Sequence, residues 1–182
     1  MQVANTAMAF APSKFLHLKH LSISLAVAYD YLSLVYFLDA APSLETFKLH
    51  VLIGLRPADE LRLEDPSHLR QIPGYRHDKL RSVKISTFYS SKGMVELVSH
   101  ILENSVSLEC LTLDTTDCSF RCSGDGSTRC SGLVRPWEAD KAVLAIEKYI
   151  KGKVPSTVKL DVVEPCNRCH VILLDGGRWI RA

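Results

Sequence analysis

The stretch from Leu80 to Thr116, LRSVKISTFYSSKGMVELVSHILENSVSLECLTLDTT, decides how this chain folds. It begins with LRSVKI at residues 80–85 and ends with LECLTL at residues 108–113, which are two copies of one apolar phrase. Between them, residues 92–104 have the spacing of an amphipathic helix, with apolar side chains at Met94, Leu97, Val98, Ile101 and Leu102. The stretch therefore predicts a strand, a helix and a second strand.

The same phrase occurs twice more, as LKHLSI at residues 18–23 and LETFKL at residues 44–49. The four copies begin at Leu18, Leu44, Leu80 and Leu108, so the steps between them are 26, 36 and 28 residues. Two of these steps fit a leucine-rich repeat of about 20–29 residues. The sequence thus predicts an α/β leucine-rich-repeat solenoid of about four to five irregular repeats, a curved parallel sheet with helices on its outer face.

Two further helices and one further strand follow from the same spacing rules. A helix that ends at Ala41-Pro42 would bury Tyr31, Leu34, Val35 and Leu38. A helix over residues 137–151 would bury Ala139, Ala142, Val143, Ile146 and Ile150. Residues 157–163 (TVKLDVV) alternate strictly and predict a half-buried strand. The asparagine that often follows the phrase is replaced by Ala26, Leu52, Phe88 and Thr116, which predicts irregular turns.

The predicted organisation is a weakly ordered leader at 1–14, a repeat domain at 15–170 and a C-terminal tail at 171–182. Inside the repeat domain, prolines and glycines mark a loop at 56–76, and small polar residues mark another at 114–136. We interpret the first loop as a solvated surface loop, and a loop that contacts a partner is the alternative.

Composition and charge exclude several classes of protein. The 182 residues have a net charge of +2, 47% hydrophobic residues and 23% charged residues, which indicates neither a nucleic-acid partner nor a membrane partner. No apolar run approaches the roughly 18 residues of a membrane span, and the first residues do not resemble a signal peptide. We therefore expect an intracellular protein, in the nucleus or cytoplasm, whose six cysteines are thiols or metal ligands.

The predicted repeat leaves one face of the sheet free for a protein partner, because side chains alternate along a strand. The candidate partner-binding residues are His20, Ser22, Ser24, Thr46, Lys48, His50, Ser82, Lys84, Ser86, Thr112, Asp114, Lys159 and Asp161. In this alignment Thr157 lies beside Cys110, so Lys48, Lys84 and Lys159 share one row, and the next row ends in Asp114 and Asp161. The alternative is that these are merely solvated strand positions.

No catalytic motif is visible, so we expect neither an enzyme nor a cofactor. Cys166-Asn-Arg-Cys169-His170 has the spacing of a metal knuckle, but we interpret the cysteines as partly buried thiols rather than as metal ligands. A zinc site at Cys166, Cys169 and His170, a redox dithiol and c-type haem attachment are the alternatives. The seven histidines are scattered, and we expect His100 at the surface.

Four segments resemble the C-terminal repeat region of the plant F-box/FBD/leucine-rich-repeat proteins. They are HDKLRSVKI at 77–85, SLECLTLDTT at 107–116, YIKGKVPSTV at 149–158 and EPCNRCH at 164–170. The resemblance extends over roughly residues 15–170. It implies that the repeats hold a protein substrate for ubiquitination by a cullin ligase.

In that family an F-box of some 40 residues docks on the Skp adaptor. No stretch before Leu18 is long enough for an F-box. Adaptor binding is therefore not expected from these residues. The alternative function is a non-ligase protein-interaction scaffold, or a truncated family member without adaptor binding.

Overall fold

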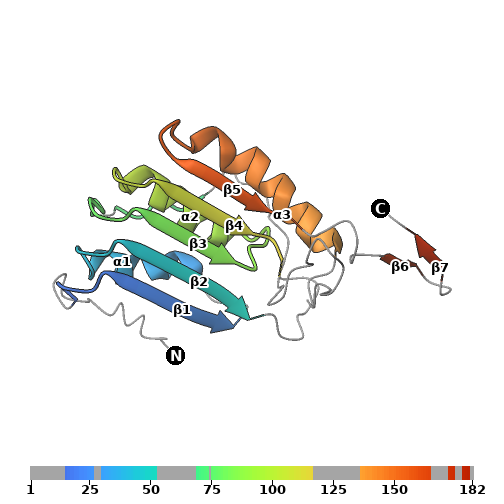
Figure 1. Ribbon diagram of the computed structural model, residues 1–182, viewed down its shortest axis with the longest axis horizontal. Helices are drawn as coiled ribbons and strands as arrows, with labels where there is room; N and C mark the ends of the chain where they lie inside the picture. The colour runs from blue at the N-terminus through green and yellow to red at the C-terminus, as the bar shows by residue number, and fades with distance from the viewer. Residues whose placement is uncertain are drawn as a thin grey trace, which may run out of the picture.

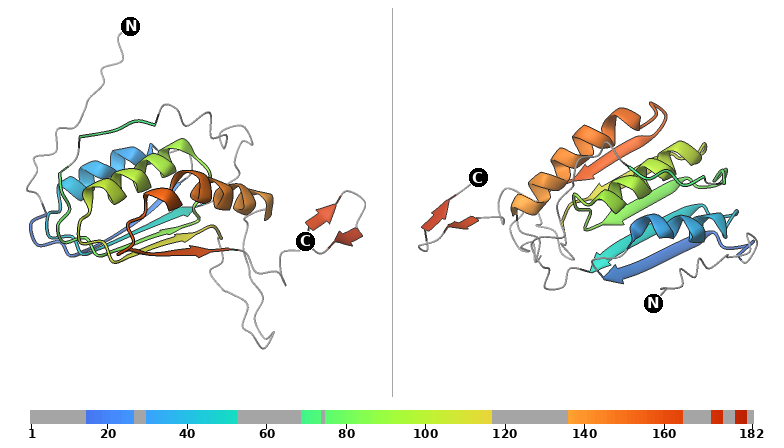
Figure 2. Two further views of the ribbon diagram at one scale, coloured as in Figure 1. Left: turned by 90° about the horizontal axis from the view of Figure 1, so that it is seen from above. Right: turned by 180° about the vertical axis from the view of Figure 1, so that it is seen from behind.

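A layer of helices covers one face of a five-stranded parallel sheet in the computed structural model (Figure 1; Figure 2). The residues that the structure describes are 15–26, 30–52, 69–73, 75–116, 136–164, 172–174 and 178–180. The strands of the sheet are β1 (His20–Ala26), β2 (Thr46–Leu52), β3 (Ser82–Ser86), β4 (Cys110–Asp114) and β5 (Lys159–Val163). Their order in the sheet is their order in the chain.

The helices all lie on the same side of this sheet (Figure 2, left). They are η1 (Tyr31–Leu34), α1 (Val35–Asp39), α2 (Lys92–Asn104), α3 (Pro136–Tyr149) and η3 (Lys151–Lys153). The predicted strand–helix–strand unit is confirmed, and α2 has the bounds that its apolar spacing predicts. Two short strands outside the main sheet, β6 (Ile172–Leu174) and β7 (Arg178–Ile180), pair antiparallel in the predicted tail.

The sheet is neither closed nor curled (Figure 1). The structure therefore confirms the predicted α/β class and a parallel sheet with its strands in chain order, but it does not confirm the curvature of a solenoid. The predicted leader at 1–14 and most of the two predicted loops lie outside the described residues. Within the second predicted loop, Asp114 still belongs to β4 and Pro136 already belongs to α3.

The apolar phrases place equivalent residues side by side on neighbouring strands. In register, one inward row consists of Leu21, Phe47, Val83, Leu111 and Leu160, and the next consists of Ile23, Leu49, Ile85, Leu113 and Val162. The three central members of each row are at most 1% exposed, whereas those on β1 and β5 are half-buried. The leading residues Leu44, Leu80 and Leu108 are buried just before their strands. Each phrase thus contributes one layer to a continuous core.

The strand starts are joined by repeated backbone hydrogen bonds. The carbonyl of Lys19 accepts from the N–H groups of Glu45 and Thr46, and the carbonyls of Glu45 and Arg81 each accept in the same way from the next strand start. The charges at these positions alternate. Lys19 pairs with Glu45 at 3.0 Å, and Arg81 pairs with Glu109 at 3.5 Å. Because these ion pairs are exposed, they specify which strands are neighbours more than they stabilise the fold.

The helix α2 is fixed at its start and along its buried face. The hydroxyl of Ser91 accepts a hydrogen bond from the N–H of Met94, which caps the helix. The predicted apolar stripe is buried throughout. Just before α2, the hydroxyl groups of Tyr89 and Tyr31 are 3.1 Å apart and their rings meet edge to face. This contact joins the segment before α2 to η1.

The turn after β3 uses a buried aromatic residue where an asparagine is often found. Thr87 adopts a positive φ of 61°, which turns the chain sharply. The next residue, Phe88, is buried and its N–H donates to the carbonyl of Asp114 at 2.7 Å. The turn is therefore irregular, as the missing asparagine predicts.

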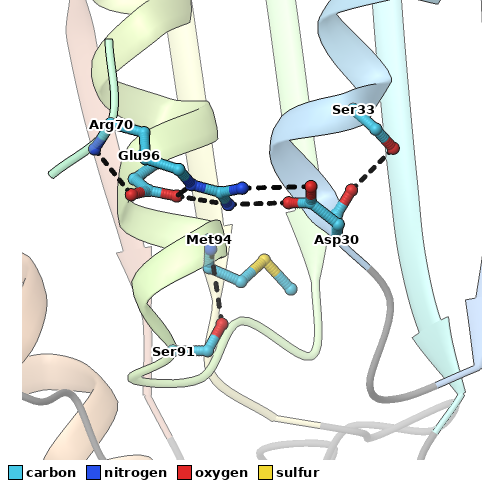
Figure 3. Close-up of polar contacts among 6 residues, drawn as sticks. All are labelled: Asp30, Ser33, Arg70, Ser91, Met94 and Glu96. Atoms are coloured by element: carbon cyan, nitrogen blue, oxygen red, sulfur yellow. Dashed lines mark hydrogen bonds and ion pairs between the residues drawn. The ribbon is translucent and has the colours of Figure 1, made fainter. Parts of the chain in front are cut away.

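A three-residue clamp holds the segment 69–73 against the helix layer (Figure 3). The backbone N–H of Arg70 donates to Glu96 Oε1 at 2.7 Å, and its guanidinium donates to Glu96 Oε2 at 2.7 and 3.0 Å. The same guanidinium donates to both carboxylate oxygens of Asp30, at 2.7 and 3.1 Å. Leu69 and Ile72 pack against the core. This part of the predicted surface loop is therefore tied to the body of the protein.

The clamp satisfies a buried charge. The side chain of Glu96 on α2 is 0% exposed, whereas those of Arg70 and Asp30 are half-exposed. Hydrogen bonding to Arg70 lowers the pKa of Asp30 below its usual value, and desolvation acts in the opposite direction. Without Arg70, the buried Glu96 carboxylate would lose its main partner.

Arg70→Ala is expected to lower the free energy of unfolding by about 2–3 kcal/mol, because it leaves the Glu96 carboxylate buried and unpaired. In a Glu96→Gln background the same change should cost less, since no charge is then stranded. Urea unfolding followed by circular dichroism measures both. Arg76→Ala is the matched control, because Arg76 and Asp78 form an exposed pair at 3.4 Å. Equal effects of Arg70→Ala and Arg76→Ala would contradict the clamp.

Leu111→Asp is expected to unfold the protein, because Leu111 is 0% exposed and an unpaired charge at a buried site costs several kcal/mol. Circular dichroism should show the loss of native structure at room temperature. Leu144→Asp is the control, since Leu144 on α3 is 68% exposed and should change stability by less than about 1 kcal/mol. A folded Leu111→Asp variant with unchanged stability would disprove the predicted inward row.

Candidate protein-interaction surface

The face of the main sheet opposite the helices is covered by no described helix or strand (Figure 2, left). We call the outward-facing residues of β1 to β5 the open face. Neighbouring strands in a sheet lie about 4.8 Å apart, so equivalent residues form continuous rows. The first row is His20, Thr46, Ser82, Cys110 and Lys159; the second is Ser22, Lys48, Lys84, Thr112 and Asp161; the third is Ser24, His50, Ser86, Asp114 and Val163.

The predicted alignment is correct for β1 to β4 and wrong for β5. Lys159 pairs with Cys110 and Asp161 pairs with Thr112, two residues away from the predicted alignment. The difference arises just before β5, at the position where each of the other phrases begins with a leucine. Here the chain turns after η3, the N–H of Val158 donates to the carbonyl of Pro155 at 2.9 Å, and the strand begins at Lys159. The predicted row of three lysines is therefore a row of two lysines and an aspartate.

Asp114 does not lie on an accessible part of the open face. Its side chain turns back to the chain that follows β4, where Oδ1 accepts from the N–H of Thr116 at 3.0 Å and from its hydroxyl at 2.7 Å. Asp114 is only 6% exposed as a result. The carboxylate of Asp114 therefore closes the turn after β4 instead of standing exposed on the open face as the strand pattern predicts.

The strongest electrostatic feature of the open face is a pair of lysines at its centre. Lys48 and Lys84 are direct neighbours on β2 and β3, and both side chains are exposed. Neither forms an ion pair with any residue that the structure describes. Like charges directly opposite each other destabilise a sheet, so this arrangement carries a cost that no described ion pair offsets. It gives the open face a concentrated positive charge.

Hydroxyl and imidazole groups surround the two lysines. Ser22 and Thr112 flank them in the same row, and His50 and Ser86 lie in the next row. His50, Ser86 and Thr112 are half-buried, whereas Ser22 is exposed. These groups both donate and accept hydrogen bonds. The surface thus offers two cations surrounded by polar groups, which suits the surface of another protein.

Several other predicted residues do not join this surface. Cys166, Cys169 and His170, the alternative metal ligands, lie outside the described residues. His100 is not at the surface as predicted, since it is only 5% exposed. It lies in the helix layer, because the segment 69–73 packs over that part of α2. None of the described helices has the length and apolar character that crossing a bilayer requires.

In a comparison with known families, residues 2–167 match a family model described as At1g61320/AtMIF1, LRR domain. The match includes all five strands of the sheet and the rows described above. It confirms the predicted plant leucine-rich-repeat region but shows no membership in the F-box or FBD family. Comparisons with curated proteins and with solved structures gave no match.

Proposed function

The chain belongs to the At1g61320/AtMIF1 leucine-rich-repeat domain family, and from this membership we propose that its open face binds a partner protein carrying acidic groups. Leucine-rich-repeat domains generally act as protein-interaction modules, because their parallel strands present an extended surface of side chains. The observation that carries the proposal is the adjacent pair of lysines, Lys48 and Lys84, at the centre of the open face.

The lysine pair favours a bound partner over a merely solvated surface. Lys48 and Lys84 oppose each other directly, although the exposed charges at the strand starts alternate in sign from strand to strand. Asp161, the acidic residue of the same row, is two strands away from Lys84, or about 10 Å. A carboxylate or phosphate group on a partner would relieve this repulsion, and fixed charges of this kind steer association and set specificity.

We propose further that the sheet is a segment of a solenoid whose concave side is the open face. The support is that strand order follows chain order and that every described helix lies on the opposite face. In such an array each repeat contacts its neighbours only. The lysine pair would then lie at the centre of the wall that meets the partner.

The more specific hypothesis is that the bound protein is a substrate of a cullin ubiquitin ligase. It rests on the resemblance of residues 77–85, 107–116, 149–158 and 164–170 to plant F-box/FBD/leucine-rich-repeat proteins. The second candidate is a non-ligase interaction scaffold, which uses the same open face for binding and needs no ligase contact. Neither hypothesis assigns a catalytic role to this chain.

The double substitution Lys48→Glu/Lys84→Glu is expected to reduce partner capture about tenfold or more without unfolding the protein, because it reverses the charge that an acidic partner meets. Affinity capture with quantitative mass spectrometry measures the effect, and thermal unfolding checks the fold. The matched control is Lys141→Glu, an exposed lysine on α3 in the helix layer. Capture that is insensitive to the double substitution would refute the assignment of the open face.

The ligase hypothesis has its own test. In plant cells that express this chain, we expect the captured partner to be ubiquitinated, and we expect that modification to fall when the Lys48→Glu/Lys84→Glu variant replaces the natural chain. Immunoblotting of the captured partner for ubiquitin, together with blots for Skp adaptor and cullin, gives the readout. A captured partner that carries no ubiquitin, without adaptor or cullin, would favour the scaffold.

A further inference from the structure

Three side chains from distant parts of the chain meet inside the helix layer, on the side of the sheet away from the open face. Asp39 is the last residue of α1, His77 precedes β3, and His100 lies on α2. One possible ligand atom from each lies within 4.8 Å of the other two. His77 Nε2 is 3.6 Å from Asp39 Oδ1, and the two imidazole rings are 6.2 Å apart between centroids.

One polar atom of each side chain is buried without a hydrogen-bond partner among the described residues. His77 is 6% exposed and His100 is 5% exposed. Within the described part of the chain, Asp39 Oδ1, His77 Nε2 and His100 Nε2 have no hydrogen-bond partner. An unsatisfied buried polar group costs about 1–3 kcal/mol, so three such atoms aimed at one another require an explanation.

We propose that Asp39, His77 and His100 bind a divalent transition-metal ion, zinc above all, through the carboxylate and the two Nε2 atoms. Zinc bonds of about 2.0–2.2 Å in a tetrahedron place ligand atoms roughly 3.3–3.6 Å apart. The 3.6 Å between His77 Nε2 and Asp39 Oδ1 fits this spacing. The remaining separations, at most 4.8 Å, need to shorten by only about 1 Å.

The backbone around the site holds the ligands in place. The N–H of His77 donates to the carbonyl of Asn104 at 2.8 Å, and the side-chain amide of Asn104 donates to the carbonyl of His100 at 2.9 Å.

The protonation states also suit a metal. Desolvation lowers the pKa of His77 to about 4, with a further contribution from His100, so the imidazole is neutral at physiological pH. Burial raises the pKa of Asp39, although a hydrogen bond with the backbone of Tyr75 opposes it. In an Asp–His⁺ ion pair, the pKa of the aspartate would be lowered and that of the histidine raised. Both shifts here have the opposite sign, so the 3.6 Å contact between His77 and Asp39 is not an ion pair. A bound cation would stabilise the carboxylate instead.

The proposed site has a structural consequence. The three ligands come from α1, α2 and the segment before β3. A metal bound only by the folded state would therefore fasten these elements together and raise stability by mass action. Three protein ligands leave one position of a tetrahedron for water.

The test uses zinc and cobalt(II) titrations of the purified, metal-free full chain. Because the six cysteines could also bind metal, the titrations are repeated on a cysteine variant in which all six are replaced by serine. We expect one equivalent of zinc to bind and to raise the unfolding temperature. The cobalt spectrum of the cysteine variant should lack a thiolate charge-transfer band, since the ligands are nitrogen and oxygen. No metal binding to the cysteine variant would overturn the proposal.

Substitution identifies the ligands. His77→Gln and His100→Gln are each expected to weaken zinc binding at least tenfold, whereas His17→Gln, at an exposed histidine, should leave it unchanged. A measurement on the natural chain avoids the risk that a variant fails to fold: zinc should shift the ¹⁵N imidazole resonances of two histidines, His77 and His100. Zinc binding that leaves both sets of resonances unmoved would also overturn the proposal.

Discussion

The structure depends on the in-register burial of apolar rows between the sheet and the helix layer. Phe47, Val83 and Leu111 are directly adjacent on three parallel strands, and none of them is exposed. This packing fixes the order of the strands, and the hydrogen bonds between strand starts fix their ends. Because side chains alternate along a strand, the same burial forces the intervening polar residues onto the open face. The core therefore determines both the fold and the surface available to a partner.

The helix layer has a different character from the open face. It contains two polar clusters in which distant segments meet, the Arg70–Glu96–Asp30 clamp and the Asp39–His77–His100 cluster. Both involve the long connection between β2 and β3, which departs from the repeat length. A connection that is longer than its neighbours needs extra attachment, and these clusters provide it through charge and through the proposed metal. The proposed partner binding at the open face and the anchoring of the β2–β3 connection in the helix layer thus lie on opposite sides of one sheet.

Much of the architecture could be predicted from the sequence because the apolar phrase is local and periodic. The bounds of α2 and the neighbours of Phe47 and Val83 followed directly from that pattern. The predicted register of β5 was wrong because its phrase begins with Thr157 rather than a leucine, although Leu160 and Val162 occupy the apolar positions that Leu111 and Leu113 occupy in β4. The burial of Asp114 and His100 was also out of reach. Asp114 is buried because its own side chain closes a turn, and His100 is buried because the segment 69–73, about 30 residues earlier in the chain, packs against α2. Neither contact leaves a periodic pattern in the sequence.

Backbone and methyl nuclear Overhauser contacts on isotope-labelled natural chain provide the most direct test of the stacked rows. Leu21 should contact Phe47, Phe47 should contact Val83, Val83 should contact Leu111, and Leu111 should contact Leu160, since neighbouring strands lie about 4.8 Å apart. Leu21 and Val83, two strands apart, should show no direct backbone contact. Contacts that join these strands in another order, or antiparallel to one another, would contradict the fold and with it the open face.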